Sequence, residues 1–168
     1  MSTSTATTFP VQRSSFQGTV HALIRTSDEL APALARVALG LTILPHGAQK
    51  TLGWFGGYGF SATMQWFTDS MRIPWVLALA AILAETLGGM ALLLGFGSRL
   101  AALGVGGVFV TAAVLLHWQH GFFMNWEGGQ QGEGVEYFVL GLALVAIVVL
   151  RGGGAASLDR ALTRALPR

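Results

Sequence analysis

The chain has 168 residues, enough for one domain. Charged residues make up 11% and hydrophobic residues 52% of it, whereas soluble globular proteins carry about 25% charged residues. With a mean hydropathy of +0.58, this composition excludes an ordinary soluble domain and predicts an integral membrane protein whose main partner is the lipid bilayer. The chain has no cysteine, which excludes disulfides and thiolate metal sites. Its few basic residues are scattered, so no nucleic-acid partner is expected.

The N-terminal residues 1–27 are rich in Ser and Thr and lack the apolar stretch of a signal peptide, so we expect a flexible cytoplasmic arm. Residues 28–155 are expected to form the transmembrane domain. A membrane-spanning helix needs about 20 apolar residues. The four predicted spans are residues 31–50, 74–96, 99–119 and 135–151, the last of which is the shortest.

The segment between the first two spans has its own helical pattern. Apolar residues recur there at helical spacing, which predicts a short amphipathic helix in the outer membrane interface. These residues are Phe60, Met64, Phe67 and Met71. The predicted fold is therefore all-α: a four-transmembrane-helix bundle with a short outer interfacial helix and an amphipathic C-terminal tail.

The second outer loop is rich in aromatic residues, which suit the headgroup zone of a membrane. They are Trp118, Phe122, Phe123 and Trp126. After the last span, residues 156–168 place small and apolar side chains on one helical face and arginines on the other. We expect this basic tail to rest on the anionic cytoplasmic leaflet.

Basic residues indicate the orientation. Arginines precede the first span, occupy the turn between the second and third, and follow the fourth. The positive-inside rule places this side in the cytoplasm. The sequence thus predicts a multi-pass protein of the bacterial inner membrane with both termini cytoplasmic.

Arg36 and Glu85 are charged residues inside the first and second spans. An ionisable residue within a span is by default a candidate functional residue. At about 1.5 Å per residue, Glu85 lies about 16 Å and Arg36 about 21 Å below the outer boundary, so we predict that they pair inside the bundle. The alternative is that such a pair only fixes helix packing, since buried pairs often add little net stability.

Further polar residues are expected to converge at the outer ends of the spans. His46 and Lys50, the only lysine, end the first span, and Pro45 is expected to kink it and free a carbonyl. The candidate catalytic residues are Glu85, Arg36, His46 and Lys50. The candidate ligand-binding residues are His117, His120, Glu136, Tyr137 and Trp54.

Three chemistries fit this set. In the first, a transition metal is held by His46, His117, His120 and Glu136. In the second, histidine, lysine and tyrosine bind the carbonyl oxygens of a quinone, and the glutamates carry protons. In the third, these residues only face water and headgroups. Glycine and alanine on the span faces fit either close packing or a slot for a flat ligand.

Four stretches together resemble the DoxX family of small bacterial membrane proteins. They are "ALARVALGLTILPHGAQKTLGWFGGYG", "LAETLGGMALLLGFGSRLAAL", "HWQHGFF" and "GEGVEYFVLGLAL", within about residues 31 to 155. The resemblance implies a four-helix membrane bundle. The family includes subunits of thiosulfate:quinone oxidoreductases, and other members are associated with redox complexes. Because this chain lacks cysteine, thiol chemistry is not expected on this subunit.

The leading hypothesis is a DoxX-type inner-membrane subunit of a quinone-linked redox system, with a polar site near the outer leaflet. Quinone is the expected cofactor, and electrons would come from a soluble or membrane redox partner. The alternative is a non-catalytic membrane anchor or assembly subunit that recruits a redox enzyme. A third hypothesis is a small-molecule transporter, which four short spans could form only as a homo-oligomer.

Overall fold

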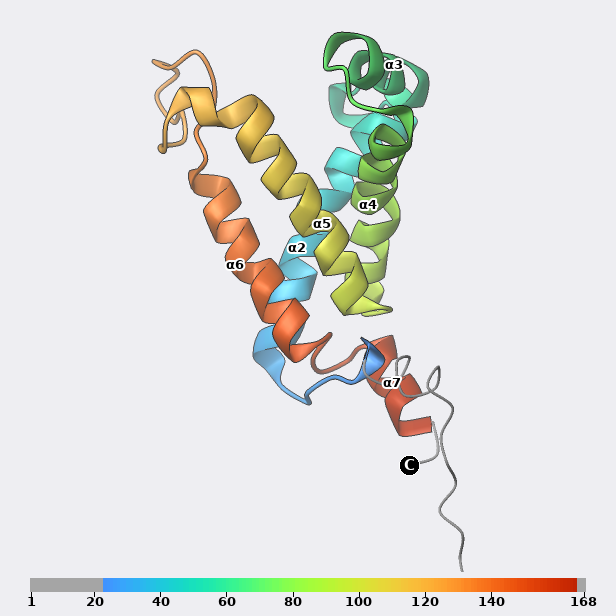
Figure 1. The fold of residues 1–168 in the computed structure, drawn as a ribbon. Helices are drawn as coiled ribbons and strands as arrows, with labels where there is room; N and C mark the ends of the chain where they lie inside the picture. Colours follow the sequence, from blue (N-terminus) through green and yellow to red (C-terminus); the bar gives the residue numbers. More distant parts are fainter. Residues whose placement is uncertain (1–22, 166–168) are drawn as a thin grey trace, which may run out of the picture.

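A computed structural model describes residues 23–165, which are helical and contain no strand (Figure 1). Most of the predicted arm, residues 1–22, and the last three residues of the predicted tail lie outside the described residues. The long helices are α2 (Leu30–Leu52), α4 (Trp75–Leu94), α5 (Ser98–Ala112) and α6 (Glu136–Arg151). The shorter ones are α3 (Gly59–Gln65) and α7 (Leu158–Ala165), with short 3-10 or π turns at Trp54–Gly56, Trp66–Ser70, Ala113–His117 and Trp118–His120.

Glycines mark the ends of these helices. α4 ends at Gly95 (φ 69°), and Gly97 (φ 56°) directly precedes α5, so both adopt the left-handed conformation that glycine reaches at little cost. The predicted turn between the second and third spans therefore forms where it was expected. Pro45 lies inside α2 without ending it, since the helix continues for seven more residues to Leu52.

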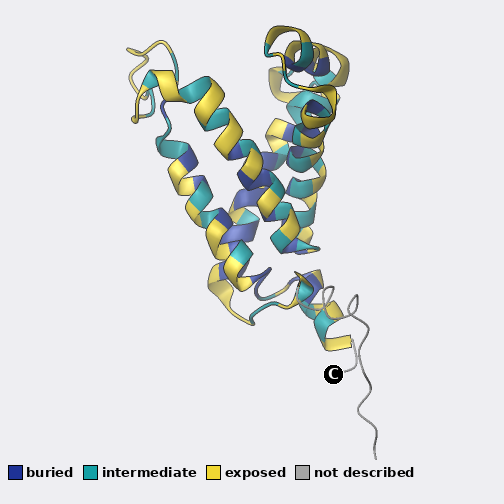
Figure 2. Ribbon diagram, viewed as in Figure 1, coloured by how far each residue is buried: buried dark blue, intermediate teal, exposed yellow. Residues whose placement is uncertain are grey.

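Three helical stretches are long and apolar enough to cross a membrane: Leu30–Leu52, Trp75–Leu94 and Ser98–His120. Large apolar side chains are exposed along them, such as Leu77 (60%) and Leu103 (54%). Figure 2 shows exposed residues on all the long helices, as expected where lipid replaces water as solvent. The prediction of an all-helical membrane protein is confirmed.

The long helices pack in a ring in which α2 and α5 each contact both α4 and α6. Glycines permit the close approach. A Cβ at Gly47 would lie 2.7 Å from Thr86 Cα, and one at Gly106 would lie 2.9 Å from Val145 Cγ1. At these positions the glycine faces serve helix packing, the first of the two predicted roles.

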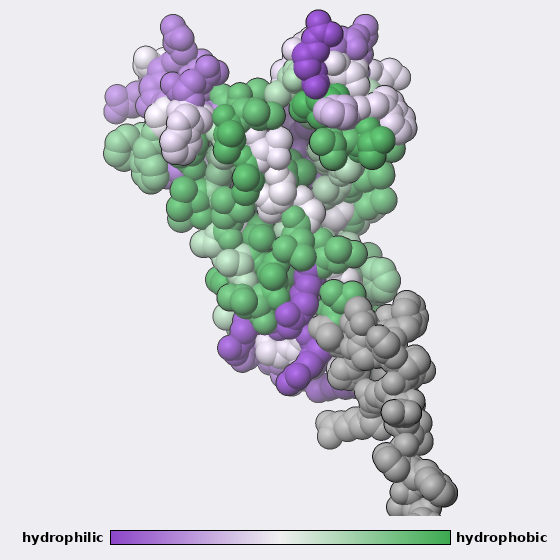
Figure 3. Space-filling view, in the orientation of Figure 1, coloured by the Kyte–Doolittle hydropathy of each residue, from purple (hydrophilic) through white to green (hydrophobic). Residues whose placement is uncertain are grey.

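The molecule has two arms (Figure 1). α2 and α4, capped by α3, form the first arm, and α5 and α6, joined by residues 121–135, form the second. We call the end with α3 and residues 121–135 the loop end, and the end with the α4–α5 turn and α7 the base. The arms separate towards the loop end, and the space-filling view shows the molecule hollowed between them, with largely hydrophobic sides (Figure 3).

The short helix predicted near residues 60–71 is present as α3 and the π turn that follows it. Its apolar face packs against α4: Met64 and Phe67 cluster with Ala78 and Ile82 of that helix. α3 therefore covers the loop end of α4 with the apolar residues that were expected to face the membrane interface.

Candidate functional site

Arg36 does not pair with Glu85, so that prediction was wrong. The guanidinium is 3% exposed and donates hydrogen bonds to backbone carbonyls at the end of α4 and in the α6–α7 linker. The acceptors are Leu92 O (2.8 Å), Leu93 O (2.7 Å), Gly153 O (2.7 Å), Ala155 O (3.4 Å) and Ala156 O (2.7 Å). The last carbonyls of a helix lack partners within the helix and carry partial negative charge, so they can satisfy a buried arginine.

The helix register explains the error. Gly40 lies against Leu93, and Gly47 against Thr86, which places Arg36 beside the end of α4. At about 1.5 Å per residue, Arg36 is about 18 Å from Glu85 along the helix axis. The sequence prediction assumed that the first and second spans end at the same depth on the loop side. In the structure α4 extends past the end of α2, and α3 packs against this extension.

Asp159 of α7 completes the base. Its carboxylate accepts hydrogen bonds from Gly97 N (2.7 Å) and Ser98 N (2.8 Å), the first amides of α5. The side chain is 1% exposed, and a carboxylate at a helix N-terminus satisfies free amides and complements the helix dipole. The helix predicted as a basic amphipathic tail resting on the membrane surface is therefore docked, through Asp159, to the α4–α5 turn.

Glu85 pairs with Lys50 instead. Lys50 Nζ lies 2.6 Å from Glu85 Oε2, and the two side chains are 23% and 6% exposed. At this separation the ammonium and the carboxylate form a charge-assisted contact, and Oε2 accepts no hydrogen bond from any other described residue. A buried carboxylate with a single charged partner is uncommon, because such groups normally accept several hydrogen bonds.

Gly47 allows the helices that carry Lys50 and Glu85 to pack closely enough for the two side chains to pair. A Cβ at Gly47 would lie 2.8 Å from the Glu85 carbonyl carbon, so only glycine lets α2 approach α4 this closely. Lys50 follows three residues later, near the end of α2, and its side chain turns back along the helix towards Glu85. A lysine at the end of a span usually extends outwards to water. The attraction of the Glu85 carboxylate must outweigh that preference.

His46 lies beside this pair. It precedes Lys50 by one helical turn, and it is close enough to both Lys50 and Glu85 to interact with their charges. Gln49 interacts with the His46 side chain and also donates a hydrogen bond from Nε2 to Phe55 O (3.2 Å). Three of the four predicted catalytic residues therefore come together, and Gln49 is a neighbour that the sequence reasoning missed.

The predicted ligand-binding residues lie mostly in the second arm. His117 Nδ1 is 2.9 Å from Glu133 O, and the His117 ring is 4.7 Å from the Phe138 ring. Glu136 Oε2 accepts a hydrogen bond from Met124 N (3.2 Å). These contacts hold residues 121–135 against the ends of α5 and α6.

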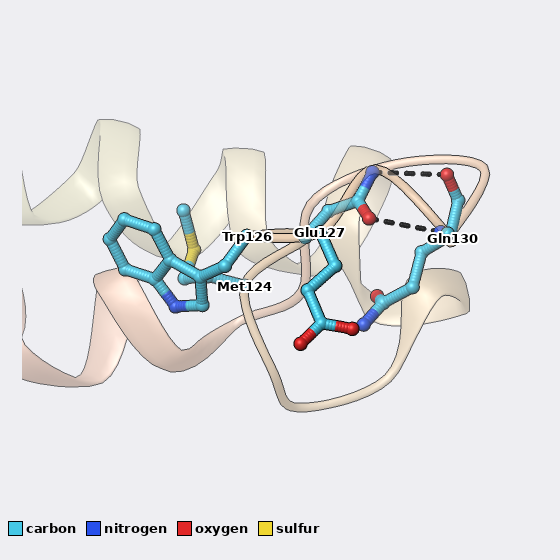
Figure 4. Close-up of a pocket in the computed structure, with 6 residues that line it drawn as sticks. Met124, Trp126, Glu127 and Gln130 are labelled. Carbon is cyan, nitrogen blue, oxygen red and sulfur yellow. Dashed lines mark hydrogen bonds between the residues drawn. The ribbon is translucent and has the colours of Figure 1, made fainter.

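A shallow pocket lies within residues 121–135 (Figure 4). Asn125 and Gln130 close it by two hydrogen bonds, Nδ2 to Gln130 O (3.0 Å) and Gln130 N to Oδ1 (2.9 Å). Glu133 Oε2 accepts the Asn125 amide at 2.6 Å. The residues that line it are Met124, Asn125, Trp126, Glu127, Gly129 and Gln130. The pocket is exposed, and hydrogen bonds within residues 121–135 form most of it. It is therefore a local feature of this loop.

The predicted residues therefore do not form one site. Within residues 23–165, no group of three or more His, Asp and Glu side chains could hold a metal ion. The alternative metal site of His46, His117, His120 and Glu136 is not assembled. His120 interacts with its neighbour Gln119 (3.4 Å), and Trp54 is 60% exposed in the turn after α2.

Tyr137 is the member of the second arm that reaches the first. Its side chain interacts with Thr42 of α2, one turn before His46, and its ring centroid lies 5.8 Å from that of Phe109. Phe109 is 3% exposed, and Gly141 of α6 makes room for its ring. Thr42 and Phe109 could not be recognised from sequence, because they carry no charge and lie on different helices.

Comparison with known proteins agrees with this architecture. The profile of the DoxX family matches residues 31–118. The inner membrane protein YqjF of Escherichia coli (strain K12) is 30% identical over 140 residues, which cover 82% of this chain and 95% of that protein. No solved structure matches the chain.

Proposed function

We propose that this chain, which belongs to the DoxX family of membrane proteins, serves a quinone-linked redox system of the inner membrane and binds the quinone head group at Lys50 and Glu85. The location is that of its E. coli relative, an inner membrane protein. Glu85 carries the proposal: it is a buried carboxylate that contacts the Lys50 ammonium, accepts no hydrogen bond from any other described residue, and lies beside a histidine.

The chemical groups fit a quinone head. Lys50 and His46 can donate hydrogen bonds to a carbonyl oxygen, and Glu85 can accept a proton from, or return one to, the same oxygen. A bound quinone would supply the redox chemistry, and the electrons would come from a partner. The residues of this chain would orient the ring and exchange protons. The hydrophobic hollow between the arms suits the apolar part of such a ligand.

Four membrane crossings are part of the proposal. α6 has 16 residues, which at about 1.5 Å each give about 24 Å, shorter than a typical span. However, residues 121–135 lie at the loop end, and Asp159 binds Gly97 and Ser98 at the base. The chain must return between these ends, and α6 is the segment that does so.

The charge distribution supports the proposed orientation. In the described chain the base carries six arginines against three carboxylates, whereas carboxylates outnumber lysine and arginine at the loop end. By the positive-inside rule the base faces the cytoplasm and the loop end is the outer end. Residues 28–155 then form the membrane domain, with both chain termini on the cytoplasmic side.

Quinone binding tests the proposal directly. The purified chain in lipid nanodiscs would be titrated with a short-tailed benzoquinone, and bound ligand would be measured by equilibrium dialysis. We expect Glu85→Gln and Lys50→Met each to weaken binding about tenfold, because each removes one charge-assisted interaction. Glu127→Gln is the matched control, since Glu127 is an exposed carboxylate of the loop. Wild-type affinity in both site variants would refute the proposed site.

A second candidate is a non-catalytic anchor that recruits a redox enzyme. The observation in its favour is the internally bonded loop 121–135, which exposes Phe123 (68%) and Trp126 (85%) at the loop end. If the double variant Phe123→Ser/Trp126→Ser loses a copurifying enzyme while Glu85→Gln retains it, and quinone does not bind, this candidate replaces the first.

A further inference from the structure

We infer that Glu85 exchanges protons with the aqueous phase at the loop end and not with the phase at the base. The proposed function concerns which ligand the site binds; this inference concerns the side from which its protons come. It stands on three features: an apolar layer below Glu85, a buried cation beneath that layer, and Lys50 above.

An apolar layer separates Glu85 from the base. Six side chains from all four long helices form it, and each is at most 2% exposed. They belong to one continuous hydrophobic cluster. None of the six side chains has a donor or an acceptor group, so the layer itself offers protons no hydrogen-bonded path. The layer consists of Leu39 and Ile43 of α2, Leu92 of α4, Ala102 and Val105 of α5, and Val148 of α6.

The base adds an electrostatic barrier beneath this layer. Arg36 is buried there with its guanidinium donors occupied by carbonyls, and the Asp159 carboxylate lies close enough to act on its charge without forming a salt bridge. A fixed positive charge in a low-dielectric region opposes the entry of protons, as arginine does in pores that exclude them.

Towards the loop end Glu85 has one polar contact, Lys50, beside the apolar cluster in which α3 covers α4. Lys50 belongs to the last turn of α2, and its ammonium reaches back to Glu85 while its side chain remains 23% exposed. Its Nζ also lies 3.5 Å from His46 O, and the His46 side chain is exposed. Lys50 therefore connects Glu85 with the outer end of the helix.

The titratable groups around Glu85 all lie on this side or beside it. α2 contributes Lys50 and His46, and α6 contributes Tyr137 near Thr42. α5 has no charged or histidine residue between Arg99 and His117, and α4 has Glu85 alone. No titratable side chain of these helices lies between Glu85 and Arg36.

If the site reduces a quinone, the sidedness has a chemical consequence. Conversion to the quinol takes two electrons, which the redox partner must supply, and two protons, one for each carbonyl oxygen. The protons would be withdrawn from the outer phase by way of Lys50 and Glu85. Oxidation of a quinol would release them to the same side.

Glu85 labelling tests the inference without any quinone. Hydrophobic carbodiimides enter the bilayer and react with protonated carboxyl groups. Proteoliposomes of known protein orientation would be prepared with different pH values inside and outside. Modification of Glu85 would be measured by mass spectrometry, with Glu85→Gln as the blank. We expect the rate to rise when the pH at the loop end is lowered and to stay unchanged when the pH at the base is lowered.

Three results would overturn the inference: a rate that follows the pH at the base, one that follows both sides, or no modification at any pH. A second measurement uses the cysteine-free chain. A His46→Cys variant should react with a membrane-impermeant thiol reagent in right-side-out vesicles and not in inside-out vesicles, and the reverse pattern would contradict the assigned side. If quinone fails to bind while labelling still follows the loop-end pH, the proposed function fails and this inference remains.

Discussion

The two buried charged sites of this protein are built in opposite ways. At the base, Arg36 is 3% exposed and donates hydrogen bonds to five carbonyl oxygens. Towards the loop end, Glu85 is 5% exposed, yet its Oε2 contacts only the Lys50 ammonium and accepts no hydrogen bond from any other described residue. Both residues occupy apolar helices at similar burial, and the difference lies in how fully each charge is satisfied.

This contrast separates structural from functional roles. A buried charge with all its hydrogen bonds made inside the protein has no capacity left for a ligand, and it fixes the elements that it joins. A buried charge with few hydrogen-bond partners costs stability, and proteins retain such groups mainly where they bind or react. Arg36, predicted as catalytic, therefore belongs to the fold, and Glu85 with Lys50 remains the candidate site.

The largest expected effect comes from Arg36. Arg36→Ala leaves several buried carbonyls without a donor, so we expect the free energy of unfolding to fall by about 3 kcal/mol or more. Arg36→Lys should retain part of the stability, since an ammonium cannot reproduce the guanidinium fork. Denaturant unfolding in detergent measures this, with Arg164→Ala as control because Arg164 is 68% exposed. An Arg36→Ala variant as stable as wild type would contradict the structural role of Arg36 and its contrast with Glu85.

Gly47→Ala should come next. A Cβ there meets the backbone of Thr86 and Glu85 at 2.7–2.8 Å, so we expect a loss of about 1–3 kcal/mol and weaker quinone binding as the helices separate. Gly107→Ala is the matched control, because a Cβ at Gly107 has nothing within 4 Å. Thermal unfolding of both variants compares them, and equal losses would show that the helix contact is loose.

Asp159→Asn tests the docking of α7. The substitution removes the charge that binds the first amides of α5, which we expect to cost about 1–2 kcal/mol. Hydrogen exchange should accelerate at Gly97 and Ser98 and remain unchanged at the loop end. Asp69→Asn, in the outer π turn, serves as control. Unaltered protection of the two amides would mean that α7 does not stabilise the base.

The smallest stability effect is expected from Glu85→Gln. It removes the buried charge itself and should change the free energy of unfolding by about 1 kcal/mol, whereas Lys50→Met leaves that charge unpaired and should cost more; the double variant should be closer to wild type than the sum of the two. A double-mutant cycle measures the coupling. A loss at Glu85 as large as that of Arg36→Ala would assign both charges to the fold.

Much of the fold could be read from local pattern. Apolar length predicted the four long helices and the turn between the second and third spans, and helical spacing predicted α3. The motifs around His46, Glu85 and Gly121 predicted the DoxX family, which the family profile confirms. These features depend on a few neighbouring residues, so hydropathy, helical spacing and short motifs are sufficient to find them.

The site could be predicted only in part. Each buried charge was recognised as unusual, but Arg36 was assigned the wrong partner, and the outer histidines were expected to meet in one pocket. Both errors concern distances between helices. The roles of Asp159 and Gln49 had no local signal, because each depends on an atom elsewhere in the chain.

Local sequence pattern was therefore enough to identify the class of protein, its helices and the unusual charged residues. Which of these charges meet depends on how the helices pack. Hydropathy measures how well a residue suits lipid, but it contains no information about the axial shift between two helices. That shift is set where Gly40 and Gly47 of α2 admit Leu93 and Thr86 of α4, and it places Lys50 beside Glu85 and Arg36 among the carbonyls of the base.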